Sequence, residues 1–82
     1  MILPTIAAVI ADVLGLGPAH GIGPSTRLCE DLATDSLDRQ CIAVDCDERF
    51  GIEIPDDDVA EWITVANIAA TVARLTEERV AA

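Results

Sequence analysis

Apolar residues near the start of the chain recur every three or four positions, which is the spacing of one face of an α-helix. These positions are Ile6, Val9, Ile10, Val13 and Leu14. Pro4 suits the first turn of such a helix, where its missing N–H costs nothing, and Gly15 ends the pattern. The pattern therefore predicts a helix from about Leu3 to Leu14.

The stretch of residues 15–35 has neither a helical nor a strand-like period. Glycines and prolines interrupt its first half, and we expect Leu28 and Leu32 to anchor its second half in the core. A connection of this length in a small domain is typical of a functional loop. His20, the one histidine, lies in this stretch, and the sequence leaves open whether it pairs with Ser36.

Residues 36–50 predict a second helix with two apolar stripes, although one stripe is enough to reach a core. We expect Asp35 to cap its start and Gly51 to follow its end. The first stripe consists of Ile42, Ala43, Cys46 and Phe50. The second stripe consists of Leu37, Cys41 and Val44. This second stripe is either more core or a contact surface among acidic residues.

Two further helices are expected in the last third of the chain. Pro55 disfavours helix at the residue before it, and a short helix over about 56–61 begins with three Asp residues that complement its dipole. A fourth helix follows, capped by Thr64, and its apolar face consists of Val65, Ile68, Ala69, Val72 and Leu75. The tail, Thr76–Ala82, is expected to fray. The pattern thus predicts an all-α fold, a small four-helix bundle with three longer helices, a short third helix and a long first loop.

The length of 82 residues suits one small domain, so residues 1–82 are interpreted as a single domain with little room for an enzymatic cleft. Fifteen acidic residues stand against five Arg and no Lys, which gives a net charge of −10. Such a charge argues against nucleic acid and anionic membrane surfaces, because both attract Lys and Arg. It favours a basic protein partner, a divalent cation or both. The stretch from Glu30 to Glu61 alone carries the whole net charge.

Cysteine usage and hydropathy indicate a reducing, cytoplasmic location. Cys29, Cys41 and Cys46 are odd in number, and the five-residue spacing of the last two is poor for a metal. The apolar start of the chain lacks the basic region of a signal peptide, and no stretch reaches the about 18 apolar residues of a membrane span. We therefore expect reduced thiols and no membrane insertion.

The residues with candidate chemistry lie at the expected start of the second helix. Asp35 and Ser36 by themselves are typical of an ordinary capped helix start. The wider stretch Glu30-Asp31-Leu32-Ala33-Thr34-Asp35-Ser36-Leu37-Asp38 resembles the attachment signature of acyl carrier proteins. Phe50-Gly51-Ile52-Glu53-Ile54-Pro55-Asp56 resembles the segment after that family's second helix, and Thr64-Val65 resembles the start of its last helix. With these spacings, the chain is identified as a member of the acyl carrier protein family.

The resemblance implies that Ser36 carries 4′-phosphopantetheine, transferred from coenzyme A by a phosphopantetheinyl transferase that uses magnesium. The family aspartate that matches Asp35 helps to position the metal, and weak divalent binding is expected at Asp35 and Asp38. The chain would then be a single, monomeric acyl carrier domain and not an enzyme. Its partners would be ketosynthases, acyltransferases and other acyl-processing enzymes of fatty acid and lipid biosynthesis.

The resemblance also makes the second helix a docking surface for basic patches on partners, which accounts for its second apolar stripe. The implied docking residues are Asp35, Leu37, Asp38, Arg39, Gln40, Cys41, Val44 and Glu48. An acyl chain, if sheltered, would lie between the second, third and fourth helices. The implied lining residues of this acyl pocket are Ala43, Cys46, Trp62 and Ala69.

Several residues depart from the usual pattern of the family. Arg39, Gln40 and Cys41 are unusual on the docking helix, and Trp62 stands where a smaller aliphatic residue is common. These departures suggest a specialised carrier for aminoacyl, polyketide or lipid A-type acyl cargo. The other alternative is an acidic helical interaction domain without a cofactor, such as a nucleic-acid mimic, in which Ser36 would be dispensable.

Overall fold

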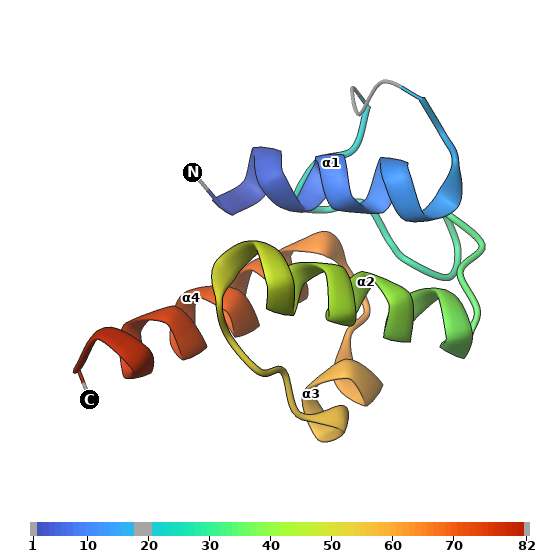
Figure 1. Cartoon of the computed structure of the whole chain (residues 1–82). Coiled ribbons are helices and arrows are strands. Elements are labelled where there is room, and N and C mark those ends of the chain that lie inside the picture. Colours follow the sequence, from blue (N-terminus) through green and yellow to red (C-terminus); the bar gives the residue numbers. More distant parts are fainter. Residues whose placement is uncertain (1, 18–20, 82) are drawn as a thin grey trace.

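Helices form where the apolar periodicity predicts them. The structure is a computed structural model that describes residues 2–17 and 21–81, with side chains as far as Glu78. Its helices are α1 (Ile2–Leu14), α2 (Ser36–Phe50), α3 (Asp56–Glu61) and α4 (Val65–Ala81), as Figure 1 shows. Within the described ranges there is no strand, and Arg27 and Thr64 form an isolated β-bridge. The predicted all-α bundle with a short third helix and a long first loop is therefore confirmed.

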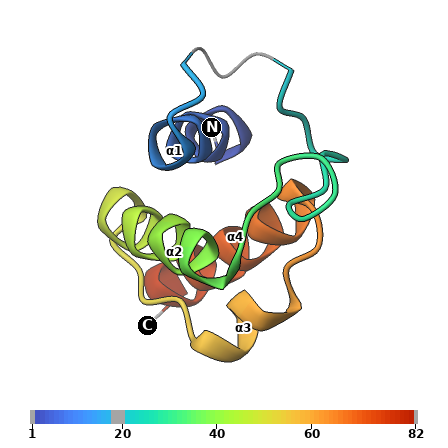
Figure 2. The same ribbon diagram turned by 90° about the vertical axis from the view of Figure 1, so that its right-hand side faces the viewer.

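One aliphatic core joins all four helices and the first loop. Its fully buried side chains are Ile6, Val9, Ile10, Leu28, Ile42, Cys46, Val65, Ile68 and Val72. The helices α2 and α4 form the middle of the molecule, and α1 and α3 pack against this pair from opposite sides (Figure 2). The first apolar stripe of α2 faces this core: Ile42, Ala43 and Cys46 are buried, and Phe50 packs partly buried against the cluster.

The long first loop is fixed to the core at Leu28. The side chain of Leu28 is fully buried, and Leu32 packs partly buried against the same cluster. The N–H of Leu28 donates to the carbonyl oxygen of Ile63 at 2.9 Å. Its carbonyl oxygen accepts from the N–H and from the hydroxyl of Thr34, each at 3.0 Å. Both predicted anchors are thus confirmed, and the loop delivers the chain to the start of α2.

The start of α4 is capped, but not by the side chain of Thr64 as predicted. The side-chain oxygen of Asn67, inside the helix, accepts from the N–H of Ile63 at 2.9 Å and of Thr64 at 2.8 Å. The hydroxyl of Thr64 donates to the same oxygen at 3.2 Å. An amide side chain in the first turn therefore satisfies the backbone that precedes the helix.

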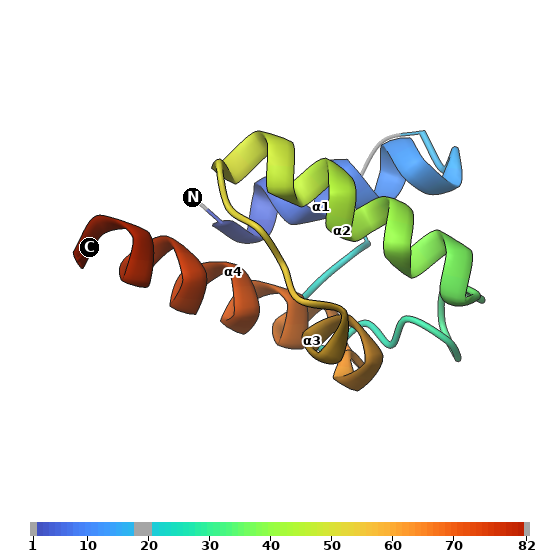
Figure 3. The same cartoon turned by 60° about the horizontal axis from the view of Figure 1, so that its bottom comes forward.

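The expectation of a frayed tail was also wrong, because α4 continues as a helix through Ala81. Leu75 packs against the core cluster, and the hydroxyl of Thr76 donates to the carbonyl oxygen of Val72 at 2.6 Å. Figure 3 shows the last turns of α4 extending away from α3. Ala82 lies outside the described residues.

The end of α2 offers a test of backbone conformation. Gly51 has a φ of 64°, and its N–H donates to the carbonyl oxygen of Asp47. Because a side chain disfavours this left-handed conformation, we expect Gly51→Ala to lower the free energy of unfolding by about 1 kcal/mol. Gly23→Ala is the matched control, since φ at Gly23 is not left-handed and an added methyl group would meet nothing within 4 Å. Urea denaturation of both variants measures the difference, and equal losses would contradict the prediction.

Candidate functional site

The start of α2 is fixed by two reciprocal hydrogen bonds between aspartates. The N–H of Asp38 donates to Oδ1 of Asp35 at 2.8 Å, and the N–H of Asp35 donates to Oδ2 of Asp38 at 3.2 Å. This is a capping box, and it satisfies two N–H groups at the helix start. The predicted cap at Asp35 is therefore confirmed, and Ser36 is the first residue of the helix.

Ser36 lies at this start with its hydroxyl and its N–H free of hydrogen bonds to described residues. The residue is exposed. Within the described part of the chain, neither its hydroxyl nor the N–H groups of Ser36 and Leu37 take part in a hydrogen bond. The N–H groups of a first helical turn have no partner inside the helix and carry partial positive charge, so they favour a phosphate. The helix start can thus accept a phosphodiester on the serine oxygen.

In the loop before α2, one arginine balances two acidic residues. Arg27 pairs with Glu30 and with Asp31, and its backbone N–H donates to the Asp31 carboxylate at 2.8 Å. This backbone hydrogen bond lowers the pKa of Asp31. Arg39 instead donates to Sγ of Cys29 at 3.3 Å and forms no ion pair with any described residue. Arg39 is therefore the arginine closest in sequence to Ser36, and no described carboxylate neutralises its charge.

The second apolar stripe of α2 is exposed and is not part of the core. Leu37 is 70% exposed and Val44 is 55% exposed, and Cys41 is exposed as well. Together with Val13 of α1 they line an open groove of about 500 Å³, which we call the α1–α2 groove. Its other lining residues are Gln40, Asp45 and Glu48. Five of the eight predicted docking residues thus meet in one apolar groove with an acidic side.

The remaining three docking residues have other partners. Asp35 and Asp38 belong to the capping box, and Arg39 contacts Cys29. They still lie beside Ser36, in the first turn of α2 or directly before it. The structure therefore brings the predicted docking residues onto one helix start and one groove.

The predicted acyl-pocket residues lie in the core. Ala43, Cys46 and Trp62 are buried, and Ala69 packs partly buried against the same cluster. Burial, and to a smaller extent the neighbouring acidic charges, raise the pKa of the Cys46 thiol to about 12. Sequence reasoning missed Thr71, which is buried and accepts a hydrogen bond from Trp62. Its position three residues after Ile68, on the apolar side of α4, was the available signal.

The other candidate chemistries have little structural support. Among the described residues, no group of three His, Cys, Asp or Glu side chains could hold a metal ion. All three cysteines are free, and Asp58 of the acidic start of α3 pairs with Arg74. His20 lies outside the described residues. None of the described helices is long and apolar enough to cross a membrane.

Comparison with known proteins decides between the interpretations that remain. A family model described as "Phosphopantetheine attachment site" matches residues 4–72. The acyl carrier protein of Acidothermus cellulolyticus is 35% identical over 75 residues, which are 92% of this chain and 88% of that protein. The chain belongs to the acyl carrier protein family. Members of this family are carriers, so the domain is not an enzyme, and its cofactor is phosphopantetheine.

Two further comparisons describe this carrier's relatives. The meromycolate extension acyl carrier protein of Mycobacterium tuberculosis is 38% identical over 77 residues. The match spans 94% of the present carrier but 66% of that relative's length. A solved structure of a putative acyl carrier protein from Mycobacterium tuberculosis superposes with a TM-score of 0.82 at 27% identity, covering 90% of this carrier and 97% of that chain. The bundle is thus the fold of the family, and an acidic interaction domain without a cofactor is not supported.

The capping box of this carrier can be tested directly. We expect Asp35→Ala to lower the free energy of unfolding by about 1 kcal/mol, because the N–H of Asp38 then loses its acceptor. Asp35→Asn keeps a side-chain oxygen in place and should cost much less. Glu48→Ala, at an exposed position of the same helix, is the control and should leave stability unchanged. Equal losses for the Ala and Asn variants in urea denaturation would show that Asp35 does not cap the helix.

Proposed function

We propose that this carrier holds acyl groups on 4′-phosphopantetheine attached to the hydroxyl oxygen of Ser36. The observation that carries the proposal is the exposed Ser36, with unpaired N–H groups, at the capped start of α2. The chain has one other serine, Ser25, which lies in the first loop and not at a helix start. When bound, the cofactor supplies a thiol that holds the acyl group as a thioester.

Attachment requires Ser36 to act as a nucleophile toward coenzyme A. The hydroxyl oxygen forms a bond to the phosphorus on the pantetheine side, the pyrophosphate bond breaks, and the adenosine part leaves as its 3′,5′-bisphosphate. The hydroxyl proton passes to a base of the transferase. The N–H groups of Ser36 and Leu37 would hold the resulting phosphodiester, as they have no other partner among the described residues.

Charge around Ser36 is balanced between attraction and repulsion. The helix start favours a phosphate by about 0.3–1 kcal/mol at an exposed site. Asp35 and Asp38 oppose it, which makes weak divalent binding at these two carboxylates part of the proposal. Arg39 lies three residues after Ser36, a spacing that puts two side chains on the same side of a helix. Arg39 would offset part of the repulsion from the two aspartates.

The α1–α2 groove supports a docking role for α2. Partners of this carrier would be a phosphopantetheinyl transferase, ketosynthases, acyltransferases and other acyl-processing enzymes with basic patches. An apolar side chain of the partner would enter between Leu37 and Val44, and cations would face Glu48. Such docking is fast, weak and sensitive to salt, which suits a shuttle that leaves as readily as it arrives.

The wider setting follows from the same proposal. We take residues 1–82 as one monomeric carrier domain that works in the cytoplasm. The name of the mycobacterial relatives, meromycolate extension carriers, favours a fatty acyl cargo over an aminoacyl one. Polyketide and lipid A-type acyl groups are the alternative cargoes. The unusual Cys41, which lines the groove, and the unusual Arg39, in the first turn of α2, favour a specialised carrier.

Attachment is tested by incubating the protein with coenzyme A, Mg²⁺ and a phosphopantetheinyl transferase, followed by mass spectrometry. We expect a gain of one phosphopantetheinyl group in the wild type and in Ser25→Ala, and no gain in Ser36→Ala. Because these are the two serines of the chain, the pair is a matched control. No gain in the wild type, or an equal gain in Ser36→Ala, would overturn the proposal.

Docking is tested with two leucines that are both exposed on helices. We expect Leu37→Ala to slow phosphopantetheine transfer roughly tenfold, because a partner loses an apolar contact next to Ser36. Leu3→Ala makes the same change on α1 and should leave the rate unaltered. Both variants should fold as stably as the wild type to within about 0.5 kcal/mol. Equal rates for the two variants would contradict a docking role for Leu37.

A further inference from the structure

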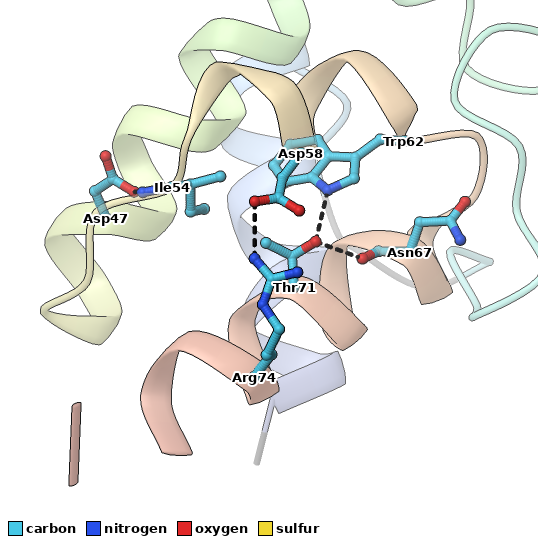
Figure 4. A network of polar contacts seen from close by, with 7 residues as sticks. All are labelled: Asp47, Ile54, Asp58, Trp62, Asn67, Thr71 and Arg74. Atoms are coloured by element: carbon cyan, nitrogen blue, oxygen red, sulfur yellow. Dashed lines mark hydrogen bonds and ion pairs between the residues drawn. The ribbon is translucent and has the colours of Figure 1, made fainter. Parts of the chain in front are cut away.

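The one tryptophan of the chain is held inside the bundle by a hydrogen bond. Trp62 ends α3 and is only 5% exposed. Its indole N–H donates to the hydroxyl oxygen of Thr71 at 3.0 Å, and that hydroxyl donates to the carbonyl oxygen of Asn67 at 3.1 Å (Figure 4). Thr71 is itself buried. The polar edge of the ring is therefore satisfied in one orientation.

The short helix that carries Trp62 is fixed at its other end as well. The N–H of Ile54 donates to Oδ1 of Asp47 on α2 at 2.9 Å, directly before the turn into α3. On the outer side, Arg74 of α4 pairs with Asp58 of α3 at 2.8 Å, close to the indole (Figure 4). Polar contacts to α2 and α4 thus hold α3 over the bundle.

The indole separates two different environments. Outside it lies a hollow of about 290 Å³ between α3 and α4, whose lining residues are Asp58, Glu61, Trp62, Asn67, Ala70, Thr71 and Arg74. These residues are largely charged or polar, so the hollow suits neither an alkyl chain nor a displaced indole ring. Inside lies the core, with small side chains at Ala43, Cys46 and Ala69. Trp62 belongs to the same cluster and is its largest side chain.

Entry of an alkyl chain into this part of the core has an identifiable cost. The chain would have to displace the ring, break the hydrogen bond from Trp62 to Thr71 and bring the apolar ring against the ion pair of Asp58 and Arg74. A buried N–H without a partner is unfavourable, and so is a core with its largest side chain displaced. The free energy gained by burying the alkyl chain would have to exceed the cost of the lost hydrogen bond and of the displaced ring together.

We propose that Trp62, held by Thr71, closes the interior of this carrier to the acyl chain, so that the cargo stays outside the bundle whatever its length. Ala43, Cys46 and Ala69 then line a space that becomes available only when the indole is removed. The inference rests on the proposed function in one respect, which is that the cargo is tethered at Ser36. It makes Trp62 the residue that sets how the carrier presents its cargo.

The test compares the wild type with Trp62→Leu, each carrying a butanoyl, octanoyl or dodecanoyl group on the arm. Mass spectrometry first confirms attachment, and circular dichroism then gives the melting temperature. In the wild type we expect less than about 2 °C difference among the three chains. In Trp62→Leu the melting temperature should rise with chain length, since the chain fills the space that the indole leaves. A rise with chain length in the wild type, or none in Trp62→Leu, would overturn the proposal.

A second arm uses the proteins without a cofactor, so it does not depend on Ser36. Free octanol is added to the wild type, Trp62→Leu, Trp62→Phe and the exposed control Ile63→Ala. We expect octanol to raise the melting temperature of the two Trp62 variants alone. If attachment fails while this arm succeeds, the function of Ser36 is wrong and the role of Trp62 stands. If the wild type is stabilised as strongly as the variants, Trp62 does not close the interior.

Discussion

The backbone of Leu28 is the point on which the arrangement of the site depends. Its carbonyl oxygen accepts both hydrogen bonds from Thr34, which immediately precedes the capping residue of α2, and its N–H donates to Ile63, between α3 and α4. The buried leucine side chain fixes this point in the core. A long loop would otherwise leave the start of α2 free to move relative to α3. One residue therefore sets both where Ser36 is presented and where the segment after Trp62 lies.

The helix α2 separates stability from recognition by using its two sides. Ile42 and Cys46 face the core, whereas Leu37 and Val44 face solvent beside acidic residues. The two stripes share no residue, so the exposed surface proposed for docking can vary while the packing stays intact. In a domain with so thin a core, this separation lets one helix pack in the core and present an exposed apolar stripe without a loss of stability.

Features determined by neighbours in the sequence could be predicted, and those determined by folding could not. Asp35 and Gly51 act within one turn of their own helix, and for that reason the bounds of α2 were predicted correctly. Two apolar stripes on α2 were visible, but which one is buried depends on where α1 and α4 lie. The hydrogen bond between Trp62 and Thr71 joins residues nine apart, one directly after α3 and one on α4, and the sequence does not reveal how these two helices are placed. The same holds for the role of Asn67 before α4.

The burial of Trp62 also determines the absorption and fluorescence of this protein. The chain has no tyrosine and one tryptophan, so its near-ultraviolet absorption and its emission come almost entirely from a single ring. That ring is shielded from water and bonded to a hydroxyl group between α3 and α4. Any event that loosens α3 from α4 will change the colour or intensity of the emitted light. The molecule thus contains its own label at the place where its interior is closed.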